Sequence, residues 1–284
     1  MEQKEKSPKR TDPADWEIGT SLSLEAWKNA RFDIEDVGRA GIRYIELAWR
    51  NDTFDMLDPY NEELCASWVR RTRDLGMDVW TMHLPYGPMW DVSLTDSLQS
   101  GEAVQRHLAL LQLANRWNIR TAVIHPSWEP IPAEERSARL DACKRNLPVL
   151  ADAAERLGVR LAVECLPRTC LGNTSLEMSS IMESDERLGV CCDVNHLLQE
   201  RSEQFIRELG SRIITVHMSD YDGLDEKHWM PGKGIVHWNE VIGTLAAHGY
   251  QGPFMFEVRE PVPSELTACW NRLLADYRQS LHHG

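Results

Sequence analysis

Six short apolar segments of the chain each end in a side chain that can bind a metal ion or transfer a proton. Imidazole and carboxylate groups are the common protein ligands of divalent cations. Several carboxylates buried together without a cation would repel one another and lose their hydration. The pattern therefore predicts a metal site. The six residues are His83, His125, Glu164, Asp193, His217 and Glu257, after VWTM, TAVI, RLAV, GVCC, IITV and FMF, and Glu46 follows IRYI in the same way.

Two adjacent cysteines, Cys191 and Cys192, precede Asp193 and raise the alternative of a thiolate site. Successive side chains of an extended strand point to opposite faces, so the two thiols would not meet at one ion. We interpret both as small buried hydrophobic residues, with Cys191 on the face of Asp193 and beneath the site. The carboxylates and imidazoles remain the predicted ligands.

The elements that must position these residues are eight apolar segments separated by stretches of helical period. Strands that alternate with helices favour a parallel sheet with right-handed crossovers. No glycine-rich phosphate loop follows the first segment, which disfavours an open dinucleotide-binding sheet. We predict one (β/α)8 barrel over 16–284, after a disordered polar tail over 1–15, with the polar residues on its C-terminal rim. The predicted strands are 17–22, 42–49, 78–84, 120–125, 159–164, 188–193, 212–217 and 253–258.

Composition and charge disfavour nucleic acid and membranes as partners. Lys and Arg number 31 against 44 Asp and Glu, and the net charge of −13 disfavours nucleic acid. No apolar run approaches the ~20 residues of a membrane span, and the polar N-terminal residues lack the apolar core of a signal peptide. The seven cysteines are odd in number and scattered, which favours reduced thiols and a cytoplasmic protein. A homo-oligomer stays open.

Four motifs together resemble the sugar phosphate isomerase/epimerase family, within the xylose-isomerase-like barrels that also include apurinic-site endonucleases. The resemblance implies a single xylose-isomerase-like TIM barrel. It also implies one divalent metal, held by Glu164, Asp193, His217 and Glu257. One imidazole and three carboxylates suit Mn²⁺, Mg²⁺ or Co²⁺ best and also accept Zn²⁺. The motifs are AVECLPRTCLGNTS (162–175), CCDVNHLLQE (191–200), the segment 214–238 and GYQGPFMFEV (249–258).

The resemblance also implies substrate-binding residues. His196 lies three residues after Asp193, where the epimerases contact substrate, and His228 precedes the Pro-Gly turn of the same family. Gly223 replaces an arginine of the epimerases, so Arg168 is our candidate for a substitute cation, and a salt bridge on the rim is the equal alternative for this residue. On the rim of the predicted barrel, His83, His125 and Glu46 are expected to line the substrate pocket.

The predicted activity is that of a metal-dependent isomerase or epimerase. Its substrate would be a small sugar, a sugar phosphate or a keto-polyol. Glu164 and Glu257, on the fifth and eighth strands, can flank a substrate as an acid–base pair. One removes a proton next to the carbonyl, and the other returns a proton to the enediolate from the opposite face.

Three alternatives remain. A lyase or dehydratase acting on a keto-sugar or keto-inositol would use the same enediolate. An endonuclease-like phosphodiesterase with three zinc ions would also use His83, His125 and His228. That set needs an acidic residue two positions before His228; Asp225 lies three before, so Glu226 would have to replace it. A non-catalytic sugar sensor is disfavoured, because no ligand or base is missing.

Overall fold

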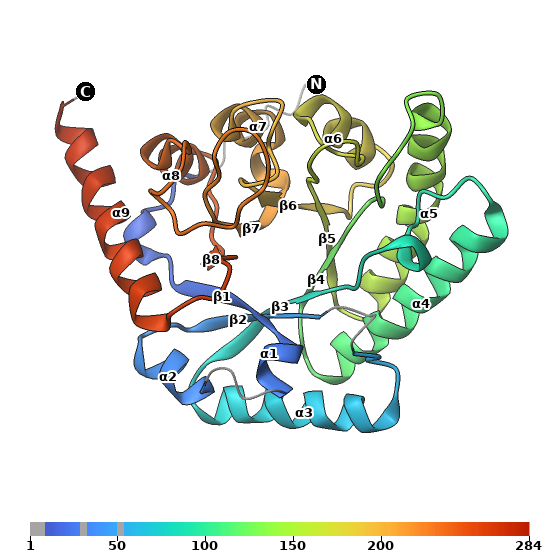
Figure 1. Cartoon of the computed structure of the whole chain (residues 1–284), viewed down its shortest axis with the longest axis horizontal. Helices are drawn as coiled ribbons and strands as arrows, with labels where there is room; N and C mark the ends of the chain where they lie inside the picture. Colours follow the sequence, from blue (N-terminus) through green and yellow to red (C-terminus); the bar gives the residue numbers. More distant parts are fainter. Residues whose placement is uncertain (1–8, 29–32, 50–53, 284) are drawn as a thin grey trace, which may run out of the picture.

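Eight parallel strands form the centre of the molecule and helices surround them (Figure 1). The computed structural model describes residues 9–28, 33–49 and 54–283. The strand order is β7-β6-β5-β4-β3-β2-β1-β8, and a parallel bridge from Met218 to Phe256 links the two end strands. The predicted barrel is thus confirmed, nearly closed at the β7–β8 seam. The strands are β1 Ile18–Ser23, β2 Tyr44–Ala48, β3 Asp78–His83, β4 Thr121–Ile124, β5 Arg160–Glu164, β6 Gly189–Asp193, β7 Ile213–His217 and β8 Phe254–Phe256.

The helices follow the strands in sequence, and residues with capping contacts or positive φ stand at several of their ends. Asp58 and Asp96 accept backbone N–H bonds at the starts of α3 and α4. Gly76 and Gly158, both at positive φ, follow the ends of α3 and α5. The α-helices are α1 Leu24–Lys28, α2 Ile34–Arg39, α3 Pro59–Asp74, α4 Ser97–Arg116, α5 Arg136–Arg156, α6 Ser175–Met182, α7 Ser202–Leu209, α8 Trp238–Ala247 and α9 Pro263–His283, and the 3-10 helices are η1 Pro13–Asp15, η2 Pro88–Trp90 and η3 Gly210–Arg212.

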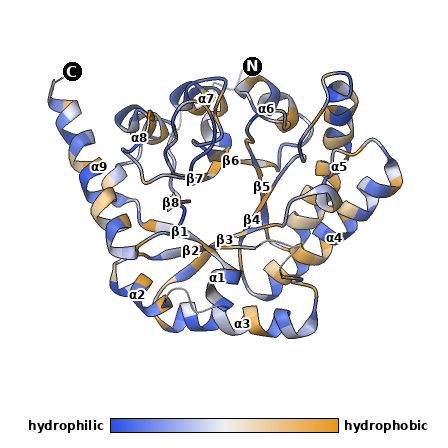
Figure 2. Ribbon diagram, in the orientation of Figure 1, coloured by the Kyte–Doolittle hydropathy of each residue, from blue (hydrophilic) through white to orange (hydrophobic). Residues whose placement is uncertain are grey.

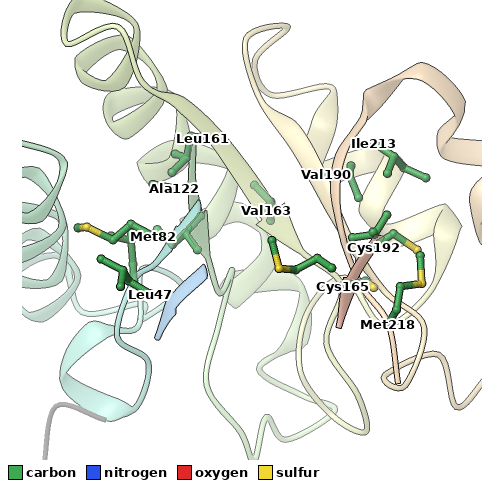
Figure 3. Close-up of a cluster of buried hydrophobic side chains, with 14 of the residues drawn as sticks. Leu47, Met82, Ala122, Leu161, Val163, Cys165, Val190, Cys192, Ile213 and Met218 are labelled. Carbon is green, nitrogen blue, oxygen red and sulfur yellow. The ribbon is translucent and has the colours of Figure 1, made fainter. Parts of the chain in front are cut away.

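The main core lies between the strands and the helices. Figure 2 shows both hydrophobic and hydrophilic residues on the surrounding helices, as expected for helices buried on one side. The strand side chains that face outward, among them Leu161, Val163 and Cys192, belong to this core (Figure 3). A smaller cluster contains Cys191 with Val123 and Ala162. The prediction that Cys191 and Cys192 point to opposite faces is confirmed.

The N-terminal segment differs from the prediction. Residues 1–8 of the expected tail lie outside the described part of the chain. Thr11, however, donates its backbone N–H to Ala246 and its hydroxyl to the carbonyl of Tyr250. Pro13–Asp15 form η1, which leads directly to β1. A disordered tail over 1–15 is therefore wrong for residues 11–15, where Thr11 is hydrogen-bonded to the barrel and Pro13 is buried. None of the described helices is long and apolar enough to cross a membrane.

Candidate active site

The four predicted metal ligands meet at the carboxyl ends of adjacent strands. Glu164, Asp193 and His217 are the last residues of β5, β6 and β7, and Glu257 follows β8. Each offers a ligand atom, and these atoms all lie within 4.8 Å of one another. The first three residues are fully buried, whereas the Glu257 side chain is 24% exposed. The carboxyl ends of barrel strands are where active sites of this fold lie.

The chemistry of this group fits a divalent cation. Among the described residues, Asp193 Oδ2 and Glu257 Oε2 are buried without a hydrogen-bond partner. Asp193 Oδ2 lies 3.2 Å from His196 Nδ1, and Glu257 Oε2 lies 3.3 Å from His217 Nδ1, but neither pair has hydrogen-bond geometry. Burial, reinforced by the charges of Asp193 and Glu164 and opposed by His217, raises the pKa of Glu257 to about 7. Three carboxylates that converge, two of them with an unpaired buried oxygen, are what a bound cation would stabilise.

Glu164 is contacted by four imidazoles, and the fourth, His196 Nδ1, lies 3.6 Å from its Oε1. His83 Nε2 and His125 Nε2 lie 3.0 and 2.9 Å from Glu164 Oε2, and His217 Nδ1 lies 3.0 Å from Oε1. Burial alone would lower the pKa of His83, but its hydrogen bond to Glu164 and the charge of that residue raise the pKa to about 9. His83 and His125 both line the pocket above Glu164, which agrees with their predicted placement.

A second group of ligand-type side chains lies beside the first. It consists of His196, Glu226 and His228. Glu226 Oε2 lies 3.1 Å from His196 Nε2, and this hydrogen bond lowers the pKa of Glu226 to about 2. The backbone N–H groups of Lys227 and His228 donate to Asn195 Oδ1, which holds His228 at a φ of 51°. Both predicted histidines thus line the pocket, together with Glu226.

Aromatic side chains form one wall of the pocket. Tyr86 stacks on His125 with ring centroids 4.5 Å apart, and on Trp128 at 5.8 Å. The prediction missed Tyr86 and Glu129. Tyr86 lies only three residues after His83, and Glu129 four after His125, which is the signal that could have found them. The pocket is lined by His83, Tyr86, His125, Trp128, Glu129, Glu164, Leu166, Pro167, Arg168, Cys170, His196, Glu226, His228 and Glu257.

Arg168 lines the mouth of the pocket, as expected of a substrate-binding residue, and it also forms the salt bridges of the alternative interpretation. Its Nε donates to Glu129 Oε1 at 2.8 Å, one terminal nitrogen donates to Asp225 at 2.7 Å, and the other donates to Glu226 at 3.2 Å. These carboxylates belong to the loops after β4 and β7, and Arg168 belongs to the loop after β5. The guanidinium therefore ties three loops together across the mouth.

Glu46 does not line the pocket, which differs from its predicted placement. It is fully buried and is not among the residues that line the pocket. Strand β2 continues to Ala48, which places Glu46 two residues before the strand end. Its Oε2 accepts a hydrogen bond from Thr81 Oγ1 at 2.8 Å and lies 3.0 Å from His217 Nε2. Glu46 thus lies behind a predicted ligand.

Comparison with known proteins agrees with this fold. A family model described as xylose isomerase-like TIM barrel matches residues 34–278. An uncharacterized protein of Methanocaldococcus jannaschii is 26% identical over 255 residues, 86% of this chain and 81% of that protein. A ketose 3-epimerase of Arthrobacter globiformis is 24% identical over 270 residues, 87% and 85% of the two chains. The crystal structure of a D-tagatose 3-epimerase-like protein superimposes with a TM-score of 0.75 at 21% identity, covering 94% of this chain and 98% of that one. The match over most of the chain establishes that this protein belongs to the xylose isomerase-like TIM barrel family.

Proposed function

We propose that the protein is a metal-dependent isomerase or epimerase of a small sugar or keto-polyol. The observation that carries the proposal is the convergence of Glu164, Asp193, His217 and Glu257 at four strand ends, with buried oxygens that lack partners. The similarity to a ketose 3-epimerase over 87% of the chain supports the same class of reaction.

These four side chains would hold one divalent cation, with Mn²⁺, Mg²⁺ and Co²⁺ favoured over Zn²⁺ by the three oxygen ligands. When bound, it would act as a Lewis acid that lowers the energy of negative charge developing on the substrate oxygens. Asp193 and His217 would bind the metal and have no other role, because both are fully buried and neither lines the pocket.

Glu164 and Glu257 have a further role in the proposal, because both line the pocket. Glu164 ends β5 and Glu257 follows β8, three strands apart around the ring. One carboxylate would remove the proton next to the carbonyl, giving an enediolate, and the other carboxyl group would return a proton. Return to the same carbon from the opposite face gives an epimer, and return to the neighbouring carbon gives an aldose–ketose isomer.

Four histidines of the pocket, His83, His125, His196 and His228, would bind substrate hydroxyl groups. The aromatic wall of Tyr86 and Trp128 would pack against the apolar C–H face of the sugar. Because Arg168 is bound to three carboxylates, it would hold the loops of the pocket in place and would not contact substrate directly.

The proposal is tested by removing the metal and one of its ligands. Chelated protein should convert no ketose, and adding Mn²⁺, Mg²⁺, Co²⁺ or Zn²⁺ should restore conversion. Asp193→Ala should lose both bound metal and activity, whereas Asp225→Ala, in the mouth, should retain its metal. Full activity after complete chelation, or unchanged metal content in Asp193→Ala, would exclude the proposed centre. A product that has lost water would instead identify a dehydratase.

One observation favours a second candidate, a phosphodiesterase with three metal ions. His196, Glu226 and His228 form a separate ligand-type group, and His83 and His125 converge on Glu164. Glu226 lies where this alternative requires an acidic side chain. Three metal ions per chain, together with cleavage of duplex DNA at an abasic site, would establish this activity in place of sugar epimerisation.

A further inference from the structure

Glu46 is a fully buried carboxylate that takes no part in lining the pocket. Its Oε2 accepts from the Thr81 hydroxyl and lies 3.0 Å from His217 Nε2, while its Oε1 has no hydrogen-bond partner among the described residues. Burying a carboxylate costs free energy unless the group is paired. A function of Glu46 in the neighbouring site would account for its burial.

The local strand geometry places Glu46 and Thr81 together. Strands β2 and β3 pair Tyr44 with Asp78 and Ile45 with Val79, but the register then shifts, and Glu46 pairs with Thr81. The extra residue on β3 is Trp80. A bulge of this kind redirects side chains and is common next to active sites. The shift brings the Thr81 hydroxyl to the same oxygen of Glu46 that faces His217.

Glu46 and Glu164 face opposite nitrogens of His217, each at 3.0 Å, so a cation that replaces the proton on Nδ1 leaves the remaining ring proton on Nε2, towards Glu46. A carboxylate accepts hydrogen bonds but cannot donate one, so the pairing with Glu46 uses this proton on Nε2. In that neutral imidazole, Nδ1 carries only its lone pair. Nδ1 is the nitrogen that faces Glu164 at 3.0 Å and Glu257 at 3.3 Å, where the cation of the proposed function would lie.

We propose that Glu46 is a positioning residue, which holds His217 with its proton on Nε2 and its Nδ1 lone pair directed at the metal centre. This inference rests on the proposed function for the metal itself. A carboxylate behind a ligating imidazole orients the ring and makes it a stronger donor, and loss of such a partner commonly costs about 10–100-fold in metal affinity. Thr81 supports the arrangement by holding the same carboxylate oxygen.

The direct test is metal affinity, measured by competition between the protein and a chelator for Mn²⁺ and for Zn²⁺. Glu46→Leu removes the acceptor at nearly constant volume and should weaken binding by about 10–100-fold. Glu46→Gln keeps the shape with a weaker, neutral acceptor, so a smaller loss is expected. Glu177→Gln changes another largely buried glutamate, which pairs with Arg136 instead and lies outside every group of possible metal ligands among the described residues, and should bind metal as the unmodified protein does.

A second readout reports the tautomer directly. In Zn²⁺-loaded protein with ¹⁵N-labelled histidine, the His217 ring should show a protonated Nε2 and a metal-bound Nδ1, and this signature should be lost or mixed in Glu46→Leu. Should Glu46→Leu fail to fold, Glu46→Gln decides the matter. Metal affinity and tautomer equal to those of the unmodified protein, in a folded Glu46 variant, would overturn the inference. Absence of metal binding by the unmodified protein would instead overturn the proposed function.

Discussion

Glu226 Oε2 lies 3.1 Å from His196 Nε2, and Glu226 precedes His228 by two residues. The proximity of this second group to the four-residue centre makes metal stoichiometry informative. We predict one metal ion per chain, with His83 and His125 in the pocket but not both ligands. Elemental analysis should therefore find the same content in the unmodified protein and in Glu226→Gln. A content near three that falls in the variant would contradict the prediction.

Arg168 should matter for substrate binding through the loops that it joins. Arg168→Gln would leave Glu129, Asp225 and Glu226 without their shared cation, so the mouth should loosen and KM should rise several-fold. The cost in stability should be only about 1 kcal/mol, because the group is partly exposed. Enzyme kinetics and urea unfolding measure the two effects.

Arg187 provides the matched control for that experiment. It also contacts three carboxylates, those of Asp152, Glu155 and Asp185, and its side chain is similarly exposed at 32%. Arg187→Gln should lower stability by a similar amount and leave KM unchanged. An equal rise in KM in both variants would show that Arg168 acts only through general stability.

The charge of the mouth predicts selectivity against phosphorylated substrates. The guanidinium of Arg168 faces the carboxylates of Glu129, Asp225 and Glu226 there, so these four side chains together carry a net negative charge. A ketose should therefore be converted with a higher kcat/KM than its phosphate ester, and added salt should narrow the difference by screening. Faster conversion of the phosphate ester would be incompatible with this account of the mouth.

His107 should make the protein sensitive to acid. Burial, partly offset by a hydrogen bond to the Trp90 carbonyl, lowers the pKa of His107 to about 4. Between pH about 6.5 and about 4 the unfolded chain binds a proton that the folded chain does not. Stability is therefore fully present above pH about 6.5 and is lost as the pH falls, by about 3 kcal/mol for this group.

The check on His107 is the pH dependence of the free energy of unfolding in urea. His107→Gln keeps a donor for the Trp90 carbonyl but cannot titrate, so its stability should fall less steeply over the same pH range. The comparison of slopes matters more than the absolute stability, because other carboxyl and imidazole groups titrate in both proteins. Parallel slopes would show that His107 does not contribute.

The sequence was sufficient to predict the barrel and the residues at its rim, because strand ends can be recognised from apolar runs that stop at a polar residue. His217 and Asp193 lie where that rule places them. Glu46 does not, because β2 runs two residues further and the register with β3 shifts beside it. Such a shift leaves no local signal in composition or alternation.

Long-range partners were the other feature that the sequence could not supply. The sequence left Arg168 between a substrate-binding cation and a rim salt bridge, because its partners Glu129 and Asp225 are 39 and 57 residues away. The stacking of Tyr86 on His125 likewise depends on how two loops meet. The partner of the Thr11 hydroxyl is Tyr250, which lies far along the chain. Polar composition near the N-terminus could not show this contact, and it led to the prediction of a tail.

The central claim, proton transfer at the carbon next to a carbonyl by Glu164 and Glu257, is tested most directly by deuterium exchange. Metal-replete protein and a ketose that it converts should be incubated in D₂O and the products analysed by NMR. The account predicts deuterium at the inverted carbon, and a strong loss of conversion in metal-replete Glu257→Gln. Product formed without deuterium, together with full activity of that variant, would contradict it.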